Sequence, residues 1–239
     1  MTPLPAAREI DLWSLALDAS PATVAALAAL LSEEERERAE RFAFAHLRRR
    51  FIVRRGALRL LLGHYTGMEA GSIVFRHAGR GKPLVDGAPH FSASHSGDLA
   101  IYAFTNASEI GIDVERIRGV EDAEGIAKRF FAPEELTQIA ALRAEERDHA
   151  FLKLWTRKEA YLKATGDGLS GSPDALSVLL DESTWRIHEL TPADGFIGAL
   201  AIRNCDAAHG PWRHLSSSDL SRNRAISPVM DASSFHHTK

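Results

Sequence analysis

The sequence predicts an α+β fold made of two halves. Its 239 residues, 45% of them hydrophobic and 26% charged, are typical of a soluble globular protein with one large or two small domains. The sequence patterns run in the order strand, helices, strands and then helices, strands, which joins two α+β units near residues 112–120. We expect an N-terminal half over 1–112, a C-terminal half over 113–215, and a serine-rich disordered tail over 216–239.

The first half begins with a strand and continues with three helices. Residues 9–17 show a two-residue alternation that predicts a strand. Ser20 supplies an N-cap and Pro21 a proline at the first helical position, while Ser32 and Glu35 have the spacing of a capping box. The expected helices span 20–31, 32–44 and 47–65.

A sheet region and a second set of helices follow. Short β-type runs broken by glycine and proline predict strands, and longer periodic runs predict helices. The expected strands span 72–76, 90–94, 99–105 and 110–115, the expected helices span 123–131, 133–142 and 145–164, and three last strands lie near 175–180, 184–190 and 196–203.

Charge, cysteine content and hydropathy exclude several classes of protein. The formal net charge of −3 provides no overall cationic field for nucleic acid or an anionic membrane. Cys205 is the only cysteine, so no intrachain disulfide forms, and the N-terminus lacks the pattern of a secretory signal. The longest mainly apolar run, 24–31, is far shorter than a membrane span. We therefore expect a cytoplasmic protein with no membrane partner.

Asp113 and Glu115 form the first candidate site. Side chains two residues apart on a strand point to the same face, so the two carboxylates would lie side by side. Such a pair is unfavourable unless a cation lies between them, and hard oxygen ligands suit Mg²⁺. The alternative is a charged strand end that faces solvent.

Glu159 and Lys163 form the second candidate site, in the segment Trp155-Thr156-Arg157-Lys158-Glu159-Ala160-Tyr161-Leu162-Lys163. They lie one helical turn apart on one face. Pairs with this spacing are common on exposed helices, which is the alternative interpretation. Glu159, however, offers the acid that would complete a three-carboxylate metal site.

Two loops could bind a phosphate. His90 and His95 are five residues apart and face opposite ways on a strand, which makes them poor partners for one zinc ion. The turn 92–97 is rich in hydroxyls and backbone N–H groups. The segment 79–83, Gly-Arg-Gly-Lys-Pro, differs from a Walker loop, since proline follows the lysine. Plain surface turns are the alternative in both places.

The expected second and third helices are rich in arginine. The stretch 48–59 holds six arginines and no acidic residue. A nucleic-acid groove is one interpretation, but the overall acidity and the lack of interleaved aromatic residues argue against it. A local pocket for a multiply phosphorylated small molecule fits better.

Together these segments resemble the 4′-phosphopantetheinyl transferases of the surfactin-synthetase-activating type. The resemblance covers about residues 31–200 and depends on four motifs in the family's order. These are Gly81-Lys82-Pro83, Phe91-Ser92-Ala93-Ser94-His95-Ser96, Gly111-Ile112-Asp113-Val114-Glu115 and the segment 155–163. The resemblance implies two pseudo-symmetric halves, each a small, mainly antiparallel sheet packed with helices.

The resemblance also implies an activity. Such an enzyme moves the 4′-phosphopantetheine arm of coenzyme A to a serine of an apo acyl- or peptidyl-carrier protein and releases adenosine 3′,5′-bisphosphate. Asp113, Glu115 and Glu159 would hold Mg²⁺, and Glu159, or a water that it orients, would take the serine proton. Lys163 would stabilise charge on the pyrophosphate, with Lys158 beside it.

The remaining carried-over positions are expected to bind coenzyme A. Ser94 and His95 would lie at the nucleotide phosphates and Lys82 near the adenosine. The same set includes Pro83, Arg38 and Arg50, with the two arginines placed for the 3′-phosphate. The sequence departs from the family nearby, because Glu35 and Phe51 fall near positions where relatives carry lysines and a small hydroxyl residue.

Two alternatives to a transferase belong to other classes of protein. One is a carrier-protein adaptor that binds coenzyme A without transferring it, and the intact Asp113, Glu115 and Glu159 argue against it. The other is a nucleic-acid-binding module on the arginine-rich helices, which would bind with strong salt dependence. We expect the transferase, as a monomer, with coenzyme A and carrier proteins as partners and no nucleic acid.

Overall fold

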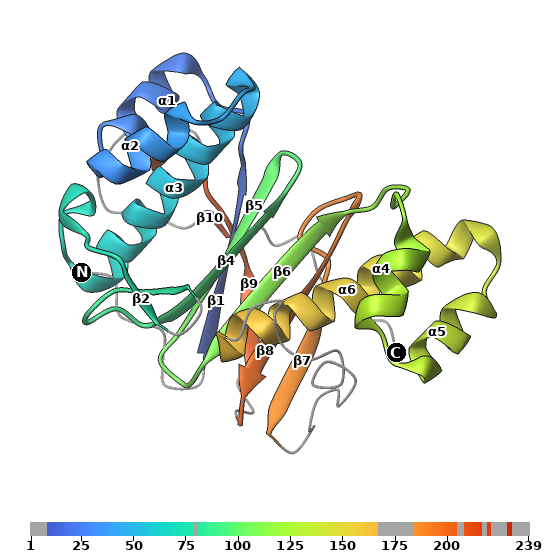
Figure 1. Cartoon of the computed structure of the whole chain (residues 1–239). Helices are drawn as coiled ribbons and strands as arrows, with labels where there is room; N and C mark the ends of the chain where they lie inside the picture. Colours follow the sequence, from blue (N-terminus) through green and yellow to red (C-terminus); the bar gives the residue numbers. More distant parts are fainter. Residues whose placement is uncertain are drawn as a thin grey trace.

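The computed structural model describes residues 9–78, 81–166, 184–204, 208–216, 219–220 and 229–230. Two main sheets lie side by side, with helices packed on both of them (Figure 1). One has the strand order β10-β9-β1-β5-β4, the other has the order β6-β8-β7, and β2 and β3 form a separate hairpin. The strands are β1 (Glu9–Ala16), β2 (Arg76–Ala78), β3 (Lys82–Leu84), β4 (His90–Ser96), β5 (Leu99–Thr105), β6 (Ile110–Arg116), β7 (Trp185–Leu190), β8 (Phe196–Arg203), β9 (Ala208–His214) and β10 (Val229–Met230).

Three helices cover the five-stranded sheet. They are α1 (Pro21–Ala28), α2 (Glu33–Glu40) and α3 (Ala45–Thr66). The predicted caps are present, because the side chain of Ser20 accepts a hydrogen bond from the backbone of Thr23, and Ser32 and Glu35 form a reciprocal capping box. Apolar residues of α3 pack on the buried face of β1 and β5, so this half has a core of its own.

The long helix α6 (Ala144–Thr165) packs on the three-stranded sheet. A Cβ at Gly111 on β6 would lie 2.0 Å from the carbonyl oxygen of Ala160 and 2.4 Å from the backbone nitrogen of Ala164. Only glycine therefore lets α6 approach β6 this closely. The helices α4 (Ala123–Phe130) and α5 (Pro133–Ala140) pack on the first turns of α6 through a separate aromatic cluster.

A shared core joins the two main sheets. Ile10, Leu12 and Ile101 of the first sheet are buried in one cluster with Ile112 and Leu200 of the second. The edge strands β4 and β6 lie against each other inside this arrangement. The two halves therefore meet along their sheets, and residues from both of them surround the same space.

The end of the chain returns to the first sheet. Strand β9, which the sequence did not predict, pairs parallel with β1 and antiparallel with β10. Asp11 of β1 accepts hydrogen bonds from Arg213 of β9 and from Tyr65 of α3. The predicted disordered tail is wrong for part of its length, because Leu220 is buried and Val229 and Met230 form β10.

Other differences from the predictions are local. The strand expected over 72–76 is wrong, because a 3-10 helix, η1 (Ala70–Ser72), precedes β2. The strand β3 covers residues expected to form a loop. The strand expected over 175–180 lies outside the described residues. No helix within the described ranges has the length and apolar character of a membrane span.

Candidate active site

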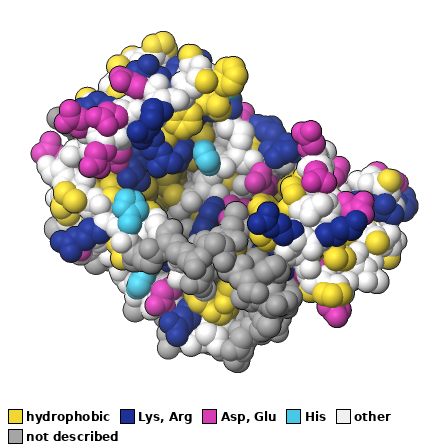
Figure 2. Space-filling model, viewed as in Figure 1, with side chains coloured by type: hydrophobic (Ala, Val, Ile, Leu, Met, Phe, Trp, Pro, Cys, Tyr) yellow, Lys and Arg dark blue, Asp and Glu magenta, His cyan; other side chains and the backbone are white. Residues whose placement is uncertain are grey.

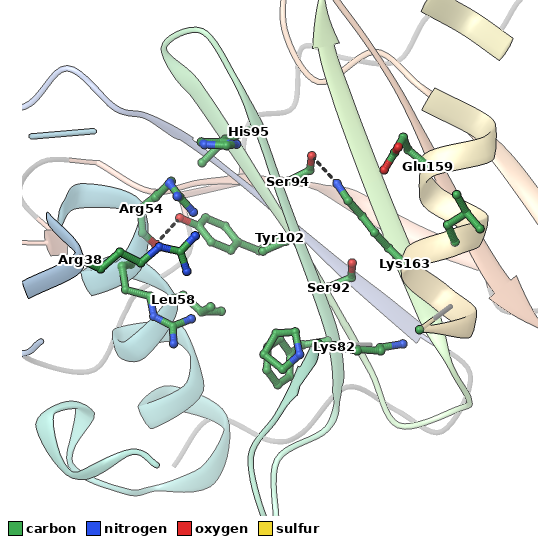
Figure 3. Close-up of a pocket in the computed structure, with 18 residues that line it drawn as sticks. Arg38, Arg54, Leu58, Lys82, Ser92, Ser94, His95, Tyr102, Glu159 and Lys163 are labelled. Carbon is green, nitrogen blue, oxygen red and sulfur yellow. Dashed lines mark hydrogen bonds between the residues drawn. The ribbon is translucent and has the colours of Figure 1, made fainter. Parts of the chain in front are cut away.

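A pocket of about 480 Å³ opens between the helices of the first half and α6 (Figure 3). One wall comes from α2 and α3, the floor from β4 and β5, and the opposite wall from α6 and the start of β3. Its polar lining residues are Arg38, Arg54, Arg55, Lys82, Ser92, Ser94, His95, Tyr102, Glu159 and Lys163.

Three alternating serines of β4 hold the edges of the two sheets together. Ser92 accepts a hydrogen bond from the backbone N–H of Ile112 at 3.0 Å. Ser94 donates to Asp113 Oδ1, and Ser96 donates to Glu115 Oε2, each at 2.7 Å. Side chains two apart on a strand share a face, so the sequence Ser-Ala-Ser-His-Ser places all three hydroxyls toward β6. Asp113 and Glu115 are both held on this side, as the strand spacing predicted.

Asp113, Ser94 and Lys163 form the centre of the site. The ammonium of Lys163 lies 2.6 Å from Asp113 Oδ1 and 2.8 Å from Ser94 Oγ. Asp113 is 4% exposed, and its other oxygen, Oδ2, is buried without a hydrogen-bond partner among the described residues. A buried, unpartnered carboxylate oxygen is costly, so this atom is a candidate to receive a donor or a cation.

Glu115 lies two residues after Asp113 on β6, and Glu159 lines the pocket. Burial, together with the charge of Asp113, raises the pKa of Glu159 above its usual value. Burial and the same charge also raise the pKa of Glu115, although the hydrogen bond from Ser96 opposes the shift. The charge of Asp113 thus disfavours ionisation of Glu115 and Glu159, and a cation would relieve this repulsion.

Whether Asp113, Glu115 and Glu159 suit a divalent cation depends on their oxygen atoms and on the charges beside them. Within the ranges that the structure describes, no three His, Cys, Asp or Glu side chains are gathered as a ready set of metal ligands. Lys163 instead supplies the positive charge beside Asp113. The unpartnered Oδ2 of Asp113 and the hard carboxylate oxygens of Glu115 and Glu159 nevertheless suit Mg²⁺.

The opposite wall of the pocket is cationic. The guanidinium groups of Arg38 and Arg54 lie 5.5 and 4.9 Å from the centre of the Phe51 ring, and neither forms an ion pair with a described carboxylate. Burial lowers the pKa of Arg54 to about 10, and the charge of Arg38 adds to this effect. Figure 2 shows Lys and Arg side chains gathered toward the centre of this face. The wall therefore favours an anionic ligand.

His95 lies between the cationic wall and Lys163. Desolvation, reinforced by the charges of Arg54 and Lys163, lowers the pKa of His95 to about 4. The imidazole is therefore neutral at pH 7, and it can both donate and accept a hydrogen bond.

Two residues predicted to bind coenzyme A lie outside the pocket lining. Arg50 forms a two-point ion pair with Asp18 and donates to the carbonyl of Gly97, which fixes the turn between β4 and β5. Lys158 is 3% exposed and lies 2.9 Å from Glu135 of α5. The side chains of both residues are used for internal contacts, so the structure does not bring them to the pocket.

Lys82 and Pro83 line the pocket, as predicted, but the ammonium of Lys82 points elsewhere. It donates to the backbone carbonyls of Ala164 and Ile110 at 2.8 and 3.0 Å. Phe130 packs against Trp155 and Phe131 against Phe151 in the aromatic cluster that joins α4, α5 and α6. Glu35, at a departure from the family pattern, binds Arg55 and Arg59.

Sequence reasoning missed Arg54 as a lining residue and the roles of Ser92 and Ser96. Arg54 was one of six similar arginines, and only the packing of α3 shows which of them faces the pocket. The alternation of Ser92, Ser94 and Ser96 was a usable signal, because three hydroxyls on one strand face at a sheet edge need partners across that edge.

Comparisons with known proteins find similar sequences for both halves of the chain. A family model described as the 4′-phosphopantetheinyl transferase superfamily matches residues 109–221, and one described as 4′-phosphopantetheinyl transferase, N-terminal, matches residues 17–107. The 4′-phosphopantetheinyl transferase HetI of Nostoc sp. is 40% identical over 207 residues, which cover 81% of this chain and 87% of HetI. The 4′-phosphopantetheinyl transferase Sfp of Bacillus subtilis is 33% identical over 154 residues, covering 64% of this chain and 67% of Sfp.

Proposed function

Because the chain belongs to the 4′-phosphopantetheinyl transferase superfamily, we propose that it transfers the 4′-phosphopantetheine arm of coenzyme A to a serine of apo carrier proteins. The observation that carries the proposal is the convergence of Asp113, Ser94 and Lys163 beside Glu159 in one pocket with a cationic opposite wall. A site of this kind suits an anionic substrate that reacts at a phosphorus atom.

The reaction forms one P–O bond and breaks another. The hydroxyl oxygen of the carrier serine bonds to the phosphorus that bears the pantetheine arm, and the bond from that phosphorus to the bridging oxygen breaks. Adenosine 3′,5′-bisphosphate leaves with the bonding electron pair. Glu159 takes the serine proton, since burial raises the pKa of its carboxylate and makes it a better base than an exposed glutamate.

Lys163 and Ser94 orient the pyrophosphate. The ammonium of Lys163 already lies between Asp113 and Ser94, so it is placed to stabilise negative charge that develops on the departing phosphate. Asp113 holds this ammonium in place through a 2.6 Å contact. Asp113, Glu115 and Glu159 would hold Mg²⁺, which when bound would neutralise charge on the pyrophosphate.

The cationic wall holds the nucleotide end of coenzyme A. Arg38 and Arg54 are its candidate partners for the 3′-phosphate, because the described carboxylates do not neutralise them. His95, neutral at pH 7, is placed to donate a hydrogen bond to a phosphate oxygen. Pro83 and the carbon chain of Lys82 supply apolar surface for the adenosine.

The ion pairs of the arginine-rich helices argue against a nucleic-acid-binding module. Arg50 is paired with Asp18, and Arg55 and Arg59 are paired with Glu35, so three of the arginines between residues 48 and 59 serve internal contacts. Arg54 faces a pocket rather than an extended groove.

Release of adenosine 3′,5′-bisphosphate from coenzyme A in the presence of an apo carrier protein tests the proposal. We expect K163M to lower the rate by about 10²-fold or more, as for the loss of one donor at a developing charge. The matched control is K153M, since Lys153 lies on the same helix and pairs with Glu189 away from the pocket. Equal rates for K163M and K153M would contradict the assignment.

A further inference from the structure

The ammonium of Lys82 connects three elements that come from different parts of the chain. Lys82 lies on β3, and its Nζ donates to the carbonyl of Ala164 on α6 at 2.8 Å and to that of Ile110 on β6 at 3.0 Å. In Figure 3 the side chain of Lys82 points toward the end of the helix that carries Glu159 and Lys163. The contact therefore lies where α6 ends against β6.

This end of α6 needs an external hydrogen-bond donor. The last four carbonyls of a helix have no partner within the helix, and Ala164 is the residue before the last one of α6. A positive charge at this end also interacts favourably with the helix dipole. Lys82 supplies both the donor and the charge.

The contact lies next to the residue that acts on the substrate. Ala164 follows Lys163 directly, and Lys163 contacts Asp113 and Ser94. At Gly111 the backbones of β6 and α6 approach each other with no side chain between them, so the position of Ala164 relative to β6 depends on backbone contacts at this point. Lys82 crosses this junction and ties its two backbones together.

We propose that Lys82 is a positioning residue for transfer, whose ammonium fixes the end of α6 against β6 and thereby fixes Lys163 opposite Asp113 and Ser94. This inference rests on the proposed function, because Lys163 is the group through which Lys82 acts. The competing role is a direct phosphate ligand, since Lys82 also lines the pocket. The two carbonyl bonds favour the positioning role, because they occupy the ammonium.

Hydrogen–deuterium exchange of the amides at the end of α6 tests, without any turnover, whether the hydrogen bonds of Lys82 hold this end of the helix in place. We expect K82M to speed exchange of residues 163–166 by about tenfold or more, because hydrogen bonds from a charged donor are lost. K82R, which keeps charge and donors, should exchange more slowly than K82M. The matched control is K128M, since Lys128 is an exposed lysine on α4 that forms an ion pair with Glu124 away from the end of α6. Unchanged exchange in K82M would overturn the proposal that Lys82 fixes the end of α6.

Steady-state kinetics separate positioning from phosphate binding. We expect K82M to lower kcat about tenfold or more, with the KM for coenzyme A changed by no more than about twofold, because the chemical group is displaced rather than removed. In a K163M background the same substitution should have little further effect. A raised KM with unchanged kcat, or equal effects of K82M with and without Lys163, would overturn the proposal.

K82M could fail to fold, and the wild-type chain could fail to transfer. If K82M does not fold, K82Q replaces it, since glutamine keeps an uncharged donor, and the same criteria apply. If the wild-type chain transfers nothing, the proposed function fails. If exchange in K82M is unchanged, the positioning role of Lys82 fails. The two failures are therefore distinguishable.

Discussion

Asp113 shows how single residues in this pocket favour function over stability. Its Oδ1 accepts hydrogen bonds from Ser94 and Lys163, while its buried Oδ2 has no hydrogen-bond partner in the part of the chain that the structure describes. The same charge raises the pKa of Glu115 and of Glu159, after the larger effect of burial. Strained groups of this kind persist where a ligand relieves them, so the three carboxylates are expected to gain stability from a bound cation.

Substitution of Glu159 is expected to change transfer activity and stability in opposite directions. E159Q is expected to lower transfer by about 10²–10⁴-fold, as for loss of a general base. It should also stabilise the ligand-free protein at pH 7. The folded-state pKa of Glu159 is raised, so its favourable contribution is complete below the unfolded-state pKa of 4.5 and is lost as the pH rises through the folded-state pKa.

Urea unfolding over a pH series checks this prediction. The difference in unfolding free energy between E159Q and wild type should grow in favour of E159Q from pH 4.5 toward neutral pH. E189Q is the matched control, because Glu189 lies on β7 and pairs with Lys153 and Arg157 outside the pocket. Full transfer by E159Q would contradict the role of Glu159.

For single residues, the sequence predicted which face of a strand a side chain occupies better than which residue that side chain contacts. The two-residue spacing of Asp113 and Glu115 indicated a common face, and both side chains do bind serines of β4. The contact of Lys163 with Asp113 joins residues 50 positions apart, so no local pattern could reveal it. Arg50 was expected to bind coenzyme A because of its place in the arginine-rich helices, and Lys158 because of its place in the motif 155–163. Tertiary ion pairs hold both side chains elsewhere.

Among the elements, α2 and α3 are joined by one buried acid. Glu35 closes the capping box of α2 and also lies 2.5 Å from Arg55 and 2.7 Å from Arg59 of α3. The sequence predicted the capping box, which is local, but not the two ion pairs, which depend on how the helices pack. Strands β2, β3 and β10 were missed for a related reason, because two or three residues are too few to show a period.

Loss of the Glu35 charge should destabilise the first half. E35Q is expected to lower the unfolding free energy at pH 7 by about 3–5 kcal/mol, because two largely buried guanidiniums lose their partner. Burial alone would raise the pKa of Glu35, but the hydrogen bond from Arg59 and the charge of Arg55 lower it overall. This contribution is therefore present above the unfolded-state pKa and is lost as the pH falls through the folded one.

Thermal and urea unfolding of E35Q and E34Q provide the measurement. Glu34 is an exposed neighbour on the same helix turn, so its substitution controls for the general loss of a carboxylate. Stability of E35Q close to that of E34Q, or an unchanged acid limb of the pH profile, would refute this role of Glu35.

At the scale of the whole molecule, the two halves are interlocked rather than merely joined in series. Strand β9 follows the C-terminal sheet in the chain but pairs with β1, and β1 lies in the N-terminal sheet (Figure 1). The order of elements predicted the α+β class and two sheets. It could not predict β9, because Gly210 and Pro211 interrupt its pattern and its pairing partner lies about 200 residues earlier.

The buried ion pair between Asp11 and Arg213 should therefore couple the two ends of the chain. A double-mutant cycle with D11N and R213M is expected to give a coupling energy of about 1–3 kcal/mol in urea unfolding, because the side chains are 8% and 24% exposed. Glu109 and Arg203, an exposed pair beside the three-stranded sheet, serve as the control cycle, with an expected coupling of less than about 1 kcal/mol. Equal coupling in the two cycles would show that β9 does not secure the first half.

Intact-mass analysis tests most directly whether this pocket is a transfer centre. A purified apo carrier protein is incubated with the chain, coenzyme A and Mg²⁺, and a parallel sample contains a chelator. We predict that the carrier gains the mass of one phosphopantetheine group and that the chelator prevents the gain. The account would be contradicted if carriers of fatty-acid, polyketide and peptide synthesis all stayed unmodified while the chain bound coenzyme A, since the pocket would then bind without transferring.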